Sequence, residues 1–188
     1  MWQLKGSLLI VPVFLFSYWT ICGGLMNSDV EFISVKGSSS NNDIFETNMK
    51  LERIKRGVYA LSGLMDFKED TTDEWMVEIV VLKSRYGNNP YKPTAIKAPK
   101  DTLHNNINGV YKRFFMNYTR ECAPKAPQIV GKFVPPLTKR RILFTRCIVT
   151  TKYFPPMEPG YFKFISKFSG RVNASWEVLA KFSRDGFF

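Results

Sequence analysis

The strongest constraint on the fold is the alternation of apolar and polar residues in several short runs. In GYFKFISKFSGRV (160–172), phenylalanines occupy one face of an extended chain, and lysine and arginine occupy the other. Successive side chains of a strand point to opposite faces of a sheet, so this period of two predicts a strand with one buried face. VYALSGLMDF (58–67), WMVEIVVLK (75–83) and SWEVLAKFS (175–183) alternate in the same way. The chain is therefore predicted to be mainly β.

We expect these strands to pair as hairpins. The polar stretch KEDTTDE (68–74) separates two of the runs, which predicts that residues 59–67 pair with residues 75–83. The last two runs predict a C-terminal hairpin that turns near 169–173. Further candidate strands are VEFISV (30–35), NMKLERI (48–54) and RRILFTRCIVTT (140–151), and GSSSNND (37–43) is expected to be a loop within one domain.

One segment has helical periodicity. From Asp101 to Tyr118 the apolar residues are three and four positions apart, which places them on one helical face. Asp101 or Thr102 suits the N-cap, and Gly109 weakens the interior of the helix. Prolines fall between the proposed strands. Together these patterns predict a mainly β domain of seven to nine strands with one helix. We expect a two-sheet β-sandwich of immunoglobulin-like kind or an open β-cup.

The amino terminus has the order of a secretory signal peptide. Lys5 precedes the apolar block 8–19, and the small residues Gly23 and Gly24 follow it. We expect a signal peptide over 1–24 and a single mature domain over 25–188, with cleavage one or two residues earlier as a variant. The alternative is an uncleaved anchor over 7–26, although the apolar block is shorter than the roughly 20 residues of a spanning helix. No second long apolar stretch follows, so the mature protein is not expected to span a membrane.

Removal of the signal peptide on export would leave an even number of cysteines. Cys22 leaves with the signal peptide, and Cys122 and Cys147 remain. An even pair in an oxidising compartment predicts one disulfide. Asn117 and Asn173 each begin an Asn-X-Ser/Thr acceptor, so both are candidate glycosylation sites of an extracellular protein.

The chain is basic, with 27 Lys and Arg against 16 Asp and Glu and a formal net charge of +11. Such a charge suits nucleic acid, anionic membranes or acidic glycans. Nucleic acid is not expected, because the protein is predicted to be secreted and no nucleic-acid-binding motif is present. The basic clusters at 50–56 and 138–141 are either solvated strand faces or contacts for anionic headgroups or glycans.

No group of residues predicts catalysis, a metal or a cofactor. His104 is the single histidine, and G-x-S-x-G, H-E-x-x-H and C-x-x-C motifs are absent. We interpret His104 as a surface or helix-face residue. The acidic residues of 69–74 lack the spacing and the glycine of a calcium loop, so they fit a solvated hairpin turn. The protein is predicted not to be an enzyme.

Aromatic residues make up 15% of the chain and are the best positive clue to function. Side chains of this kind either fill the space between two sheets or surround a pocket for an apolar ligand. On the residues alone, a solid core is the simpler interpretation. The candidate lining residues are Tyr59, Trp75, Phe114, Phe162, Phe164 and Phe168.

Three passages resemble the insect CheB family of secreted chemosensory proteins, which is distantly similar to the ganglioside-activator and ML lipid-recognition proteins. They are RGVYALSGLMDFKED (56–70), YKRFFMNYTREC (111–122) and CIVTTKYFPPMEPGYFKFISKFSGRV (147–172), in a shared order. The likeness covers about residues 30–182. It implies a β-cup that holds a lipid, contact pheromone or cuticular hydrocarbon, with a sensory receptor or epithelial-type sodium channel as partner. The resemblance therefore favours a pocket over a solid core.

The expected function is a secreted, non-enzymatic binding protein for a hydrophobic ligand in chemosensation, within the gustatory response to pheromones. The alternative is a secreted interaction module with no internal ligand. Such a module would dock on a receptor, a channel or an anionic surface through its basic strand faces.

Overall fold

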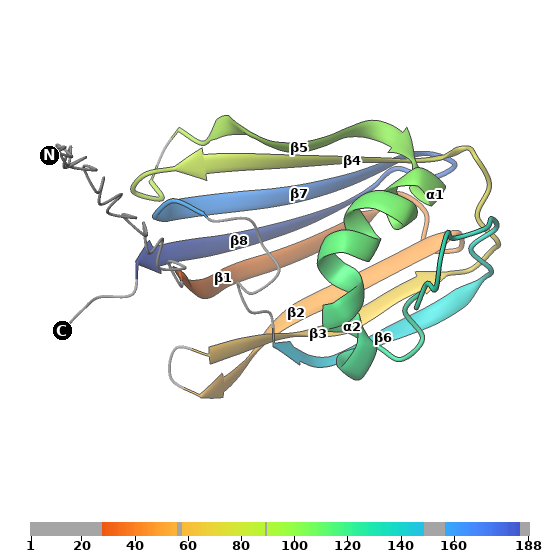
Figure 1. Cartoon of the computed structure of the whole chain (residues 1–188), viewed down its shortest axis with the longest axis horizontal. Helices are drawn as coiled ribbons and strands as arrows, with labels where there is room; N and C mark the ends of the chain where they lie inside the picture. Colours follow the sequence, from red (N-terminus) through yellow and green to blue (C-terminus); the bar gives the residue numbers. More distant parts are fainter. Residues whose placement is uncertain (1–27, 56–57, 89, 149–156, 185–188) are drawn as a thin grey trace, which may run out of the picture.

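The computed structural model describes residues 28–55, 58–88, 90–148 and 157–184. The proposed signal peptide and Cys22 lie outside these residues. Within them, eight strands form two antiparallel sheets, and one helix lies beside them (Figure 1). The strands are β1 Ser28–Ser39, β2 Phe45–Lys55, β3 Val58–Phe67, β4 Trp75–Ser84, β5 Lys92–Thr102, β6 Arg140–Ile148, β7 Gly160–Gly170 and β8 Ala174–Arg184.

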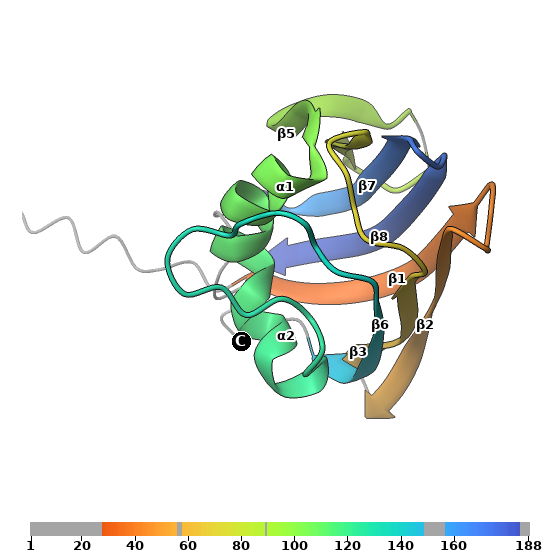
Figure 2. The ribbon, with the colours of Figure 1, turned by 90° about the vertical axis from the view of Figure 1, so that its right-hand side faces the viewer.

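The two sheets face each other and converge along one side. One sheet has the order β1-β8-β7-β4-β5 and the other has the order β2-β3-β6. On one side β1 and β2 lie next to each other, which brings the sheets together there. On the opposite side β5 and β6 are far apart, and the helix fills the opening (Figure 2). The predicted two-sheet β-sandwich with one helix is confirmed.

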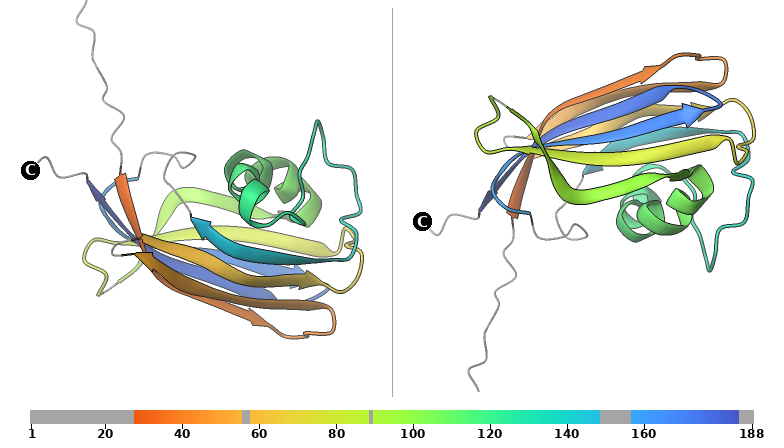
Figure 3. Two further views of the ribbon diagram at one scale, coloured as in Figure 1. Left: turned by 90° about the horizontal axis from the view of Figure 1, so that it is seen from below. Right: turned by 90° about the horizontal axis from the view of Figure 1, so that it is seen from above.

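The helix runs without a break through three segments: α1 Leu103–Asn106, the π-helical η1 Ile107–Phe115, and α2 Met116–Cys122. Its N-cap is Thr102, whose side chain accepts a hydrogen bond from the backbone N–H of Asn105. This confirms one of the two predicted caps, while the carboxylate of Asp101 accepts from the backbone N–H of Thr102 at 2.7 Å and from the side-chain amide of Asn105 at 2.9 Å. The first turn contacts β4 and β5 and the last turn contacts β6, so the helix bridges the two sheets (Figure 3).

The predicted pairing of residues 59–67 with residues 75–83 is wrong. β3 pairs with β2 and β6, whereas β4 pairs with β5 and β7. The connection 68–74 crosses from one sheet to the other, and the backbone N–H of Thr71 donates to the carbonyl of Leu137 at 2.9 Å. The apolar faces of β3 and β4 meet across the core, where the rings of Phe67 and Trp75 are 5.5 Å apart. The C-terminal hairpin of β7 and β8 is confirmed.

The candidate strands at 30–35, 48–54 and 140–148 are confirmed as parts of β1, β2 and β6, while 149–151 lie outside the described residues. β5 was not predicted from the sequence, because Pro93 and Pro99 are typical of a connection between strands. Among the described strands, β5 lies at the edge of its sheet and pairs with β4 alone. Proline is tolerated at a sheet edge, and lysines such as Lys97 discourage pairing with another chain.

Two groups of aromatic side chains fill parts of the interior. At one end Phe45, Phe67, Trp75 and Phe168 pack with ring centroids 4.9–5.9 Å apart. A second cluster joins Phe162 and Phe182, whose centroids are 5.2 Å apart. Between these clusters the packing is incomplete, and this is where the candidate site lies. No helix among the described residues is long and apolar enough to cross a membrane.

Candidate functional site

Two adjoining cavities lie between the sheets and beneath the helix. The first has a volume of about 120 Å³ and the second a volume of about 180 Å³. Their shared wall is formed by the middle of β4, β6 and β7, the start of β8, and the helix. It consists of Ile79, Phe115, Thr119, Phe144, Ser166 and Trp176.

The two cavities extend from this shared wall along different elements. The first reaches Val30 and Phe32 of β1 and Phe182 of β8. The second reaches Leu103 at the start of the helix and Leu137 in the loop 123–139 that follows it. An apolar cavity of about 150 Å³ is large enough to bind benzene. The second cavity exceeds that volume and the first is smaller, and together they suit a longer apolar chain.

Within the described residues, no charged side chain lines either cavity. Most polar groups in the walls already have partners. The hydroxyl of Tyr111 donates to the carbonyl of Pro127 at 2.8 Å and lies 2.9 Å from the hydroxyl of Thr119. Burial raises the pKa of Tyr111. The side-chain amide of Asn106 donates to the carbonyl of Thr102 at 3.1 Å. The walls thus offer an apolar, uncharged environment.

The six aromatic residues proposed from the sequence are distributed over the cavities and the solid core. Phe164 lines the first cavity and Phe168 the second. Trp75 and Phe162 are buried in the two aromatic clusters and line neither cavity. Neither Tyr59 nor Phe114 lines a cavity, and the guanidinium of Arg113 stacks over the ring of Phe114.

The centre of the site consists of residues that were not predicted from the sequence as lining residues. Ile79 occupies an inward position in the middle of β4, and Trp176 occupies an inward position near the start of β8. An inward position was a usable signal, since residues there border the space between two sheets. Phe144 on β6 follows the same rule. Phe115 belongs to the apolar helical face predicted over 101–118, but its neighbour Phe114 fits that face equally well, so the sequence did not distinguish the two.

The predicted disulfide between Cys122 and Cys147 is confirmed, and the two Cα atoms are 5.2 Å apart. The bridge connects the end of α2 to β6 and forms part of the wall of the first cavity. The two candidate glycosylation sites are exposed: Asn117 lies on α2, and Asn173 lies in the turn between β7 and β8.

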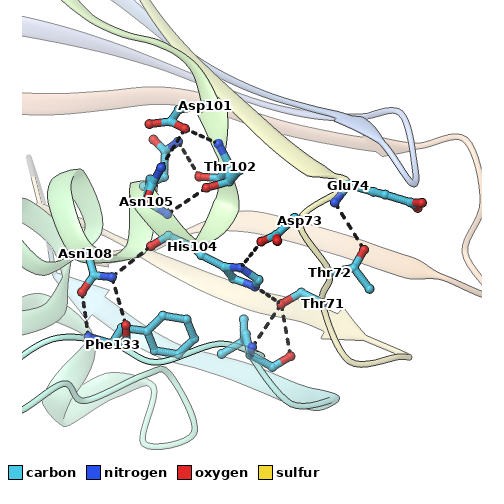
Figure 4. Close-up of polar contacts among 12 residues, drawn as sticks. Thr71, Thr72, Asp73, Glu74, Asp101, Thr102, His104, Asn105, Asn108 and Phe133 are labelled. Atoms are coloured by element: carbon cyan, nitrogen blue, oxygen red, sulfur yellow. Dashed lines mark hydrogen bonds and ion pairs between the residues drawn. The ribbon is translucent and has the colours of Figure 1, made fainter.

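His104 is buried, not a surface residue, at 5% exposure on the inner face of α1. Figure 4 shows its ring between the side chains of Asp73 and Thr71. Its Nδ1 lies 3.1 Å from a carboxylate oxygen of Asp73, and its Nε2 lies 2.9 Å from the hydroxyl of Thr71. The hydroxyl of Thr71 also accepts from the backbone N–H of Leu137, at 3.1 Å. Since Thr71 is 2% exposed, this contact joins the loops 68–74 and 123–139 to the helix.

Three acidic residues of the connection 68–74, Glu69, Asp70 and Asp73, have separate partners. The carboxylate of Glu69 pairs with the guanidinium of Arg171 at 2.7 Å, which lowers the pKa of Glu69. Asp70 accepts a hydrogen bond from the backbone N–H of Lys139 at 2.6 Å. The segment is a connection between sheets rather than the expected hairpin turn. No group of three His, Cys, Asp or Glu side chains in the described ranges could hold a metal ion.

Comparison of the chain with protein-family models and with curated proteins gives no match.

Proposed function

We propose that this protein is a secreted, non-enzymatic binding protein that holds a hydrophobic ligand between its two sheets. The observation that carries the proposal is the pair of adjoining, uncharged cavities in the middle of the sandwich. Protein interiors are normally close-packed, and unfilled space costs about 24 cal/mol per Å³. An apolar occupant offsets this cost.

The proposed setting is extracellular chemosensation, with a pheromone, lipid or cuticular hydrocarbon as ligand and a sensory receptor or sodium-type channel as partner. The resemblance of three long passages to secreted chemosensory proteins supports this setting. The Cys122–Cys147 bridge supports an oxidising compartment, where structural disulfides persist. The intact mass of the exported protein tests the compartment. The proposal of secretion fails if the exported chain retains Cys22 or if no chain is exported.

Displacement of a fluorescent apolar probe from the purified protein tests ligand binding. Ile79→Phe should abolish probe binding. The larger ring would extend from the shared wall into the space of both cavities, and the core would stay apolar. The matched control is Val80→Phe, which places the same ring on the outer face of the same strand and should leave binding unchanged. Absence of probe binding by the folded wild-type protein, together with absence of any extractable lipid, would refute the proposal.

A second candidate function, docking on an anionic lipid surface, is favoured by the loop 123–139. Val130 and Val134 are 99% and 76% exposed there, and the exposed Lys125, Lys132 and Lys139 belong to the same loop. Exposed apolar residues among lysines suit a membrane interface with anionic headgroups. Binding to vesicles that contain phosphatidylserine should weaken in moderate salt and in a variant with Lys139, Arg140 and Arg141 changed to Gln. Ile79→Phe should not affect it.

A further inference from the structure

Ser166 interrupts a row of phenylalanines on the inner face of β7. Inward and outward positions alternate along the strand, and Phe164 and Phe168, two residues to either side, line the first and the second cavity. Ser166 itself lines both cavities. Its side chain is much smaller than a phenyl ring. Serine at this inward position therefore leaves room where the two cavities adjoin.

Ser166 is also the centre of a row of three residues that crosses the sheet. In the antiparallel register it lies directly opposite Ile79 of β4 on one side and Trp176 of β8 on the other. Directly opposed residues share one face of a sheet. Both neighbours line the two cavities, as Ser166 does. A ligand that extends through both cavities therefore passes over the side chain of Ser166.

The hydroxyl of Ser166 has no hydrogen-bond partner among the described residues and is not closed off from the space around it. In the described part of the chain, the unpaired side-chain atoms that are shielded from solvent are Oγ1 of Thr47 and Nε1 of Trp75 and Trp176. The hydroxyl of Ser166 is not one of them, and its residue is half-buried. A serine hydroxyl can donate one hydrogen bond and can also accept. This group is thus available to an oxygen atom of a ligand.

Three other polar side chains of the walls have partners of their own. The hydroxyls of Tyr111 and Thr119 lie within hydrogen-bond distance of each other and bond to nearby carbonyls. The amide of Asn106 bonds to the carbonyl of Thr102. Among the described residues, neither cavity has a charged side chain in its wall, and burial of an ionised group without a counter-charge is strongly unfavourable. The site therefore suits an uncharged polar group at Ser166.

We propose that Ser166 determines ligand specificity: the ligand has one uncharged oxygen between two apolar arms, and this oxygen bonds to the hydroxyl of Ser166 while the arms occupy the two cavities. A ketone oxygen accepts from the hydroxyl, and an alcohol can also donate to it. A butyl arm is smaller than benzene, which a cavity of about 150 Å³ holds, so arms of this size suit both cavities. This inference rests on the proposed binding function and specifies the class of ligand.

Ser169 provides a matched control on the same strand. It lies opposite Met76 of β4 in the register, on the outer face of the sheet, and it lines neither cavity. Ser169→Ala removes the same hydroxyl from the same type of residue, on the face away from the proposed ligand.

The test compares two isomeric ketones as competitors of the fluorescent apolar probe. Dibutyl ketone has its oxygen between equal arms, and heptyl methyl ketone has the same composition with its oxygen near one end. Wild-type protein should bind dibutyl ketone about three- to tenfold more tightly, as expected for one net hydrogen bond. Ser166→Ala should bind the two isomers equally, and Ser169→Ala should keep the full preference. Nonane has no oxygen, so Ser166→Ala should bind it as tightly as the wild type does.

Several outcomes would overturn the inference. They are equal binding of the two isomers by the wild type, an unchanged preference in Ser166→Ala, and an equal loss of affinity for nonane and dibutyl ketone in Ser166→Ala, which would indicate a structural role alone. In each of these cases the proposed binding function still stands, because the compounds displace the probe from the wild type. Failure of every compound to bind the wild type would instead refute the binding function itself, and the inference with it.

Discussion

Cys122 and Cys147 are joined by a disulfide, and both residues line the first cavity. One belongs to the last turn of the helix and the other to β6, at the border of the open side of the sandwich. The bridge therefore holds the end of the helix over the opening and at the same time forms part of the proposed binding site.

Removing this bridge should destabilise the protein. The two cysteines are 25 residues apart in sequence, and closing a loop of this size lowers the free energy of the folded state relative to the unfolded state by about 3–4 kcal/mol. The double variant Cys122→Ala with Cys147→Ala should lose this amount in urea unfolding, and wild-type protein in reductant should match it. A double variant as stable as the oxidised wild type would contradict the structural role of the bridge.

The contact of His104 with Thr71 predicts a second, distinct loss of stability. Thr71→Val keeps the shape of the side chain but leaves the backbone N–H of Leu137 and a ring nitrogen of His104 without this partner in a buried site. We expect the free energy of unfolding to fall by about 2–3 kcal/mol. Thr72→Val, one residue along and exposed, should change it by less than about 1 kcal/mol. Similar losses for the two variants would show that the buried contact has no special role.

Tyr111 should make the free energy of unfolding depend on pH in the alkaline range. Burial raises its pKa above the ordinary value of 10.0, so the folded state holds the phenol proton more tightly than the unfolded state does. The resulting stabilisation is complete below pH 10 and is lost as pH rises through the folded-state pKa. The slope is at most about 1.4 kcal/mol per pH unit for one group. Urea unfolding should show a steeper decline above pH 10 for the wild type than for Tyr111→Phe. Equal slopes would refute the assignment.

The fold was largely predictable, because alternation of apolar residues depends on the geometry of a single strand. It identified the segments of seven strands, and the helical spacing identified the helix with its cap at Thr102. Strand partners were harder, since a polar connection such as 68–74 looks the same whether it turns within a sheet or crosses between sheets. β5 was hidden by Pro93 and Pro99, which the edge of a sheet tolerates and the centre does not.

The site was less predictable than the fold. Trp75 and Phe162 are buried in the two aromatic clusters, whereas other aromatic residues, Phe115, Phe144 and Trp176, form part of the shared wall of the cavities. The space remains beside smaller side chains, Ile79 and Ser166, at the middle of the strands. A sequence pattern gives the face of a residue but not how completely the opposite layer covers it. Only the three-dimensional packing of the helix over the sheets provides that information.

Replacing glycine with alanine should change the free energy of unfolding in opposite directions at Gly63 and Gly109. Gly63 of β3 has φ +144°, and an added Cβ would lie 2.2 Å from the carbonyl oxygen of Asn48 and 2.8 Å from Cα of Met49 on β2. Gly63→Ala should therefore lower the free energy of unfolding by at least about 2 kcal/mol, because the backbone of β2 would have to move.

Gly109 is exposed within the helix, and nothing lies within 4 Å of an added Cβ. Gly109→Ala should stabilise the protein by about 0.5–1 kcal/mol, because alanine loses less backbone entropy in a helix. Thermal and urea unfolding of the two variants measure both effects. A destabilised Gly109→Ala would mean that the helix covering the cavities depends on glycine at this position, and a fully stable Gly63→Ala would contradict the close approach of β2 to β3.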